Sequence, residues 1–286
     1  MQCVVRQAAV RNQMRILLIV LLLCATASRL GAQGGPPFFT DDPGTPGNRN
    51  WEINLGLAGT HTPGGGDYDV PNFDFNYGLG ERMQLKYEIP ISAATGEHNI
   101  TRAGLGNSLA GIKIRPYEHR QPAAQASEDS VNFSIGTYPQ VLVSNPTRSV
   151  QRGVAEPGPQ YYLPLQATAK LGPVALNGEV GRWFGNRHVP SRIASGLIAG
   201  HVFSERLELF AEVYNLQDTE RIGTEARQHS LTLDAGGRRA LDANGHIRLL
   251  FMGGRSLRQT SRTNGEPDWI AYLGLQFQLQ PKKEKR

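Results

Sequence analysis

Seven histidines and a scatter of carboxylates are the side chains of this 286-residue chain that could bind a metal or carry out catalysis. The histidines are His61, His98, His119, His188, His201, His229 and His246. Most of them fall in stretches that we expect to be loops or turns, so solvated side chains explain them better than a converging metal site. The sequence contains no Gly-Lys-Ser/Thr phosphate loop, His-Glu-x-x-His zinc pair or Gly-x-Ser-x-Gly elbow. We therefore expect a protein that is not an enzyme, with no catalytic residue, no metal ligand and no cofactor.

Three short patterns suggest chemistry but have simpler structural explanations. Gly104-Leu105-Gly106 begins like a dinucleotide fingerprint, yet it precedes an expected strand instead of a helix, and its third glycine is misplaced. Asn186, His188 and Ser191 share one expected loop, as in a barrel phospholipase, but their spacing matches no motif. Asp41-Asp42 suits a cation site near the periplasmic mouth of a barrel, or a turn in which the Asp side chains bond their own backbone. The flanking Pro and Gly residues favour the turn.

Charged residues at alternating strand positions are the stronger functional candidates. We expect the following side chains to line the lumen of a barrel: Lys86, Glu88, Glu179, Arg182, Glu208, Glu212, Arg238 and Arg248. Two arrangements remain open for them. They line a narrow aqueous path, which we favour, or they pair across the lumen and close it.

The elements that must position these charges are strands with alternating apolar and polar residues. Trp51-Glu52-Ile53-Asn54-Leu55-Gly56-Leu57 places every apolar side chain on one face, which is period-two β structure. Similar stretches predict twelve strands near residues 50–58, 69–79, 82–92, 104–115, 130–143, 159–170, 174–184, 193–203, 206–215, 228–238, 246–254 and 268–279. No apolar run after the N-terminal region approaches the length of a transmembrane helix.

The lengths of the strands and of their connections indicate a membrane barrel. Many strands have about 9–12 residues, which suits a tilted membrane-spanning strand. Odd connections such as 59–68, 93–103 and 144–158 are long and polar or Gly-rich, whereas even ones such as Gly80-Glu81 are tight. This alternation is typical of outer-membrane barrels with long external loops and short periplasmic turns. The long connection 116–129 is the exception. The sequence thus predicts an all-β fold, a transmembrane antiparallel up-and-down β-barrel over residues 33–280.

A soluble β-sandwich is the main alternative, because it shows the same alternation with its apolar face turned inward. Three features favour the barrel: the rhythm of the loops, a polar face that mixes charges with glycine, and aromatic residues near strand ends. Those aromatic residues are Trp51, Tyr87, Trp183, Trp269 and Tyr272, and they are expected to form interface girdles.

The N-terminus predicts export to the outer membrane. Arg6, Arg11 and Arg15 precede the apolar run 16–23, which fades into small residues, as in a cleaved signal peptide over residues 1–32. Cleavage after Ala27 is the alternative to cleavage after Ala32. Cys24 also suggests a lipoprotein, although the residue before it is not small. The expected partners are outer-membrane lipid and the barrel-assembly machinery.

Cysteine and charge distributions exclude several other classes. Both cysteines lie within the expected signal, so disulfides and thiol catalysis are not expected in the mature chain. The formal charge of +5 comes from the ends: the signal region carries +4 and the basic tail at 281–286 adds +3, which leaves −2 for the rest. Because no basic stripe lies on a folded face, we expect no nucleic-acid partner.

Several segments, in order along the mature chain, resemble the bacterial family labelled after the meta-cleavage pathway of phenol degradation. The segments are Pro37-Phe38-Phe39-Thr40-Asp41-Asp42-Pro43, Trp51-Glu52-Ile53-Asn54, Phe73 to Leu79, Gln84 to Pro90, Gly104 to Ser108, Asn177 to Gly181 with Trp183-Phe184, and Gly274-Leu275-Gln276. The resemblance implies an outer-membrane barrel that acts as a transporter. Barrels of this type often end on an aromatic residue, whereas here Phe277 and Leu279 are followed by the basic tail.

Together these patterns predict an outer-membrane channel or transporter for a small solute, hydrophobic or aromatic if the family label is a guide. The alternative is a structural or surface-interaction barrel with a plugged lumen. Neither function involves catalysis.

Overall fold

The computed structural model describes residues 35–62, 64–96, 101–119, 131–171, 174–221, 227–259 and 269–281. Its strands are β1 (Trp51–Thr62), β2 (Gly65–Leu79), β3 (Met83–Thr95), β4 (Thr101–Leu105), β5 (Ser108–His119), β6 (Val131–Thr137), β7 (Gln140–Val143), β8 (Gln160–Leu171), β9 (Val174–Phe184), β10 (Arg192–Ser204), β11 (Leu207–Asp218), β12 (His229–Ala240), β13 (Ile247–Gln259) and β14 (Trp269–Leu279). The expected signal peptide and most of the basic tail lie outside these residues. Among the described residues, no helix has the length and hydrophobicity to cross a membrane.

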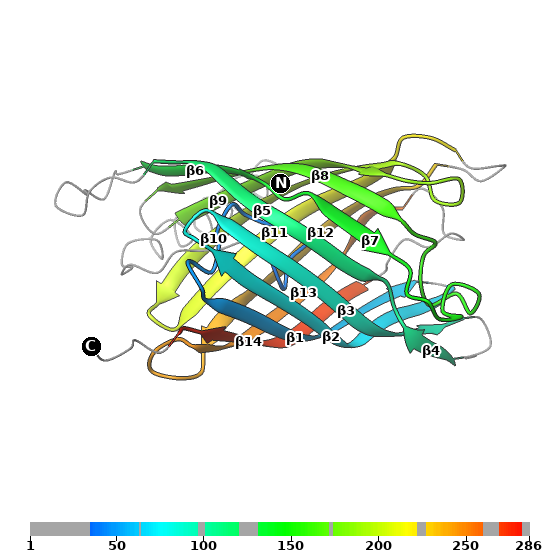
Figure 1. Cartoon of the computed structure of the whole chain (residues 1–286), viewed down its shortest axis with the longest axis horizontal. Helices are drawn as coiled ribbons and strands as arrows, with labels where there is room; N and C mark the ends of the chain where they lie inside the picture. Colours follow the sequence, from blue (N-terminus) through cyan, green and yellow to red (C-terminus); the bar gives the residue numbers. More distant parts are fainter. Residues whose placement is uncertain are drawn as a thin grey trace, which may run out of the picture.

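These strands form a closed antiparallel barrel (Figure 1). Outside the short strands β4 to β7, neighbours in the chain are neighbours in the sheet. β1 pairs with β14 from Trp51↔Leu279 to His61↔Trp269, which closes the sheet. β4 and β5 both pair with β3, and β6 and β7 both pair with β8, so each pair is one barrel strand with a break. The barrel therefore has 12 strands. The predicted fold class is confirmed, and its strand positions agree closely with the alternating stretches of the sequence.

The outer face of the barrel is apolar. Its exposed side chains include Leu55, Leu85, Leu163, Leu165, Leu197, Val213, Leu233 and Leu273. An exposed apolar band that encircles a closed barrel is stable only where lipid covers it. Trp51, Tyr87 and Trp269 lie on this face, as expected for girdle residues. The expectation was wrong for Trp183 and Tyr272, whose register partners Tyr162 and Met252 face the lumen with them.

Several external loops are shorter than predicted, because the strands extend into them. β1 continues to Thr62 and β2 starts at Gly65, so most of the expected loop 59–68 is a strand hairpin. Of the connections expected on the periplasmic side, those at 80–82 and 205–206 have the expected tight form. Gly80 and Gly245 both have a φ of 69°, which glycine adopts readily. β5 runs to His119, and the rest of the unusually long connection lies outside the described residues.

Residues 35–50 precede the first strand and run inside the barrel. Figure 1 shows the start of this blue segment surrounded by the strands, with β4 at the right end of the barrel. Arg49 N donates to Gly78 O, and Gly78 N donates to Asn50 O, which fixes the segment beside the periplasmic end of β2. The residues that precede this point in the sequence lie inside the lumen. We call residues 35–43 the lumen segment.

Candidate functional site

The lumen segment packs on an apolar patch of the inner wall. Phe38 is buried against Phe210, with ring centroids 5.4 Å apart, in a cluster that also contains Ile198, Met252 and Ile270. These wall residues come from β10, β11, β13 and β14, so the inner wall carries an apolar patch over these strands. Such a patch inside a barrel has no lipid to cover it, and burial of Phe38 removes it from water.

Polar contacts hold the same segment from several directions. The Glu212 carboxylate on β11 accepts hydrogen bonds from Phe39 N at 3.0 Å and Thr40 N at 2.6 Å. Lys113 on β5 forms an ion pair with Asp41 at 2.9 Å. Arg238 on β12 donates to Pro36 O at 2.9 Å. Hydrogen bonds to charged groups contribute more than neutral ones, so these anchors fix the backbone of the segment in one position.

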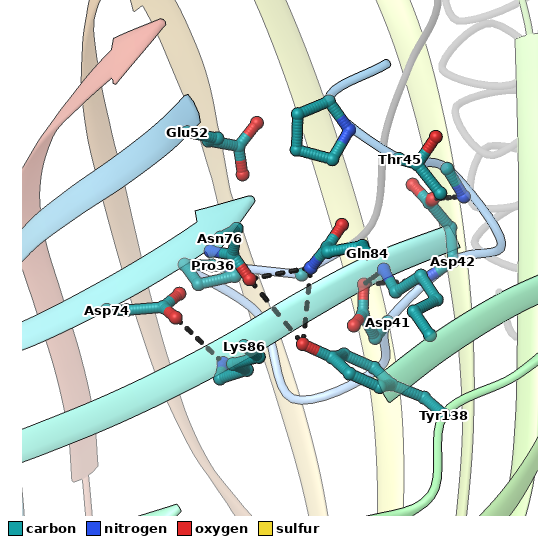
Figure 2. A pocket seen from close by; sticks show the side chains of 14 residues that line it. Pro36, Asp41, Asp42, Thr45, Glu52, Asp74, Asn76, Gln84, Lys86 and Tyr138 are labelled. Carbon is teal, nitrogen blue, oxygen red and sulfur yellow. Dashed lines mark hydrogen bonds and ion pairs between the residues drawn. The ribbon is translucent and has the colours of Figure 1, made fainter. Parts of the chain in front are cut away.

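A polar network covers the opposite wall (Figure 2). Gln84 Nε2 donates to Asn76 Oδ1 at 2.6 Å and contacts the Tyr138 hydroxyl at 3.2 Å. Lys86 pairs with Asp74 at 3.3 Å and with Glu88 at 2.9 Å. Between this wall and the lumen segment lies a gap of about 30 Å³. A gap of this size holds about one or two water molecules.

Larger cavities lie on either side of the lumen segment. The outer chamber, toward the extracellular loops, has a volume of about 760 Å³ and touches Pro37, Phe39, Trp183 and Tyr272. The inner chamber, toward the periplasmic turns, has about 700 Å³ and is lined mainly by polar residues, among them Glu81, Arg115 and Lys170. The lumen segment thus separates two chambers of different polarity.

The outer chamber has a roof formed by residues 144–158. Asn107, at the break between β4 and β5, bonds Glu156 twice: its amide donates to Glu156 O at 2.8 Å, and its oxygen accepts from Glu156 N at 2.7 Å. Asn145 donates to Gly106 O at 2.6 Å. The break therefore frees backbone and side-chain groups that hold the roof. At the same rim, the backbone N–H of Ser191 donates to Glu220 and lowers the pKa of that carboxyl.

Of the eight charged residues proposed to line the lumen, the strand register places seven on inward-facing positions. They are Lys86, Glu88, Glu179, Glu208, Glu212, Arg238 and Arg248. Arg182 is different: it pairs with Leu163 and Ile193, is exposed, and lies over the Phe184 ring on the outer face. Whether the seven contribute to a solute path stays a prediction.

Several inward charges have partners instead of facing open water. Glu179 accepts from the Tyr162 hydroxyl and from Gln166 Nε2, both at 2.7 Å. Glu212 holds the lumen segment, and Arg248 bonds Gly245 O in a periplasmic turn. These contacts anchor the inward charges on the wall, on the lumen segment and in a turn, and whether the charges line an aqueous path or close the lumen stays a prediction.

The residues of the weaker sequence patterns have local hydrogen-bond or ion-pair partners. Asp41 is in an ion pair with Lys113, and an Asp42 oxygen accepts from Gly44 N, as the turn interpretation expects. Asn186 Oδ1 accepts from His188 N, and Ser191 Oγ accepts from Gly185 N, so each of these side chains bonds the backbone of its own loop. Within the described ranges, no three His, Cys, Asp or Glu residues are grouped to hold a metal ion. His98 lies outside those ranges.

Comparison with solved structures finds the same barrel fold in outer-membrane channels. The structure is similar to that of the COG4313 outer membrane channel from Pseudomonas putida F1, with a TM-score of 0.60 at 14% identity, over 86% of this chain and 100% of that one. It is also similar to the NanC porin, with a TM-score of 0.53 at 6% identity, over 80% of this chain and 100% of that one. No family model matches the chain, and no curated protein matches its sequence. At these identities the likeness shows the fold.

The main feature missed by sequence reasoning is the lumen segment. Its Pro37-Phe38-Phe39 run carries a signal of its own, because two consecutive phenylalanines outside any strand need an apolar partner. Such a run next to a strand pattern with apolar residues at inward positions, such as Ile198 and Phe210, could have indicated an internal plug.

Proposed function

We propose that this protein is an outer-membrane channel that admits small, partly apolar solutes to its outer chamber, and that the lumen segment limits their passage to the periplasm. The supporting observation is the division of the lumen into two chambers by a segment of the chain, with a gap of only about 30 Å³ beside it. This function requires no chemistry. Lipid and the barrel-assembly machinery are the partners that such a barrel needs.

The lining of the outer chamber supports the solute class. Pro37 and Phe39 form part of its floor, and Trp183, Met252 and Ile270 add apolar surface from the wall. Its volume of about 760 Å³ lies within the range of cavities that bind small molecules. A hydrophobic or aromatic solute, as the family resemblance implies, would bury its surface against these residues.

A structural or surface-interaction barrel with a closed lumen is the second candidate. The observation that favours it is the fit of the lumen segment, which buries Phe38 and is held by three charged residues. In that case the segment would not move, and the acidic residues would serve as interior partners.

Single-channel recordings of the refolded mature chain separate the two candidates. We expect low conductance for the full chain and a conductance higher by about tenfold for a variant that lacks residues 35–43, because the gap would merge the two chambers. Added aromatic solute should reduce the current through the shortened variant.

Folding is checked for both proteins by the shift between boiled and unboiled samples on detergent gels. If both fold and neither conducts, the barrel is structural. If both conduct equally, the lumen segment is not the constriction and the proposed gating role is wrong.

A further inference from the structure

The charges around the outer chamber are all of one sign. Asp67 and Asp69 from β2, Glu88 from β3 and Glu156 from the roof line it, and among the described residues no lysine, arginine or histidine does so. The inner chamber differs, because its lining includes both an acidic residue, Glu81, and a basic one, Arg115. The outer chamber therefore has an electrostatic preference that the lumen as a whole lacks.

Two of these four carboxylates have charged partners. Lys86 forms an ion pair with Glu88 at 2.9 Å, and Arg192 forms an ion pair with Glu156 at 3.1 Å. The described ion pairs do not include Asp67 or Asp69. Asp69 accepts a hydrogen bond from Ser92 Oγ at 2.5 Å, which holds its carboxylate toward the chamber without neutralising it. The net negative charge of the chamber is thus concentrated on one side, on β2.

Aromatic and aliphatic side chains form the other side. Phe39 is 42% exposed although its ring stacks on Tyr214, with centroids 5.0 Å apart, and it belongs to the floor of the chamber. Trp183 stacks on Tyr162 at 4.6 Å, which fixes its ring at the wall. Rigid aromatic faces bury apolar groups and also attract cations.

We infer that the outer chamber is a binding site for organic cations, in which an apolar body contacts Phe39 and Trp183 and an ammonium group faces Asp67 and Asp69. The inference rests on the proposed function, since it names the class of solute that enters the same chamber. A neutral solute would gain only the apolar contacts, and an anion would meet the repulsion of the carboxylates. Charge complementarity would thus select among solutes of equal size.

Three probes of similar size and different charge test this inference: 2-phenylethylamine, 2-phenylethanol and phenylacetate. Binding to the full mature chain is measured by calorimetry in zwitterionic phosphatidylcholine nanodiscs, with empty nanodiscs subtracted. We expect the amine to bind at least about tenfold more tightly than the alcohol, and phenylacetate to bind most weakly.

Combined Asp67→Asn and Asp69→Asn substitutions should remove this preference and leave the affinity for 2-phenylethanol nearly unchanged. Asparagine keeps an oxygen that can accept from Ser92, so the local structure is retained. Glu205→Gln is the matched control, because it removes one negative charge from an exposed periplasmic turn and should change nothing. If the double variant does not refold, Asp67→Asn alone provides the test, since Asp67 is exposed.

Equal affinities for the amine and the alcohol, or a preference that survives the double substitution, would overturn the inference and leave the channel proposal standing. If none of the probes binds, the chamber is not a solute site, while the conductance experiment still decides whether the barrel is a channel.

Discussion

Glu212 is the residue that fixes the lumen segment most directly, because one carboxylate accepts two backbone N–H groups of that segment. Glutamine at this position keeps one acceptor oxygen and turns an amide donor toward the other N–H. We expect Glu212→Gln to weaken docking by about 1.5–3 kcal/mol, the size of a hydrogen bond to a charged group. Openings in single-channel recordings should become at least about tenfold more frequent, since each 1.4 kcal/mol is a factor of ten. Unchanged opening in a folded variant would show that Glu212 does not hold the gate.

Gly196 offers a second test of the same contact without a change of charge. A Cβ added at Gly196 would collide with the Thr40 hydroxyl of the lumen segment. Gly196→Ala should therefore displace the segment and raise conductance. Gly178→Ala is the matched control, because nothing lies within 4 Å of a Cβ at that position. An equal effect of the two substitutions would mean that the change acts through strand properties and not through Thr40.

At the scale of elements, the two faces of β11 should differ in the substitutions that they tolerate: the outer face faces lipid and the inner face faces the lumen. Val213 is 43% exposed on the outer face near the middle of this strand, whereas Glu208 is buried inside. Val213→Arg should cost about 2–4 kcal/mol in refolding titrations into lipid vesicles, the penalty for arginine near the bilayer midplane. Glu208→Gln should cost far less, since it leaves the lipid-facing surface unchanged. A larger penalty for Glu208→Gln would indicate that the faces are inverted.

The strands could be read from the sequence because alternation depends only on local order. Trp51 to Leu57 shows the pattern directly, and β1 has that register. Trp183 could not be placed in the same way, because its neighbours Arg182 and Phe184 leave open which face turns outward. The breaks at Gly106-Asn107 and Tyr138-Pro139 also depend on contacts with distant residues, such as Asn107 with Glu156. The lumen segment has no regular alternation of apolar and polar residues, so its position inside the barrel can be derived only once the barrel is closed.

At the scale of the whole molecule, the apolar belt and the closed sheet predict membrane residence. The mature chain should fractionate with the outer membrane and migrate differently on detergent gels before and after boiling, because a closed barrel resists detergent until it is heated. Recovery as a soluble periplasmic protein with no such shift would contradict the membrane assignment. The refolded protein with its C-terminal tail removed is a useful control, since the tail lies beyond β14 and should not affect the shift.

The lumen segment also has a consequence for the order in which the molecule is assembled. Residues 35–43 come before every strand, yet their partners lie on β5, β11 and β12, as much as 203 residues later in the chain. Contacts between such distant residues form late, after the intervening chain has been ordered. The earliest part of the described chain is thus the last to find its place. It either lies in the forming lumen while β1 pairs with β14 or enters the lumen afterwards from the periplasmic end. In both cases its docking is complete only when the barrel is complete.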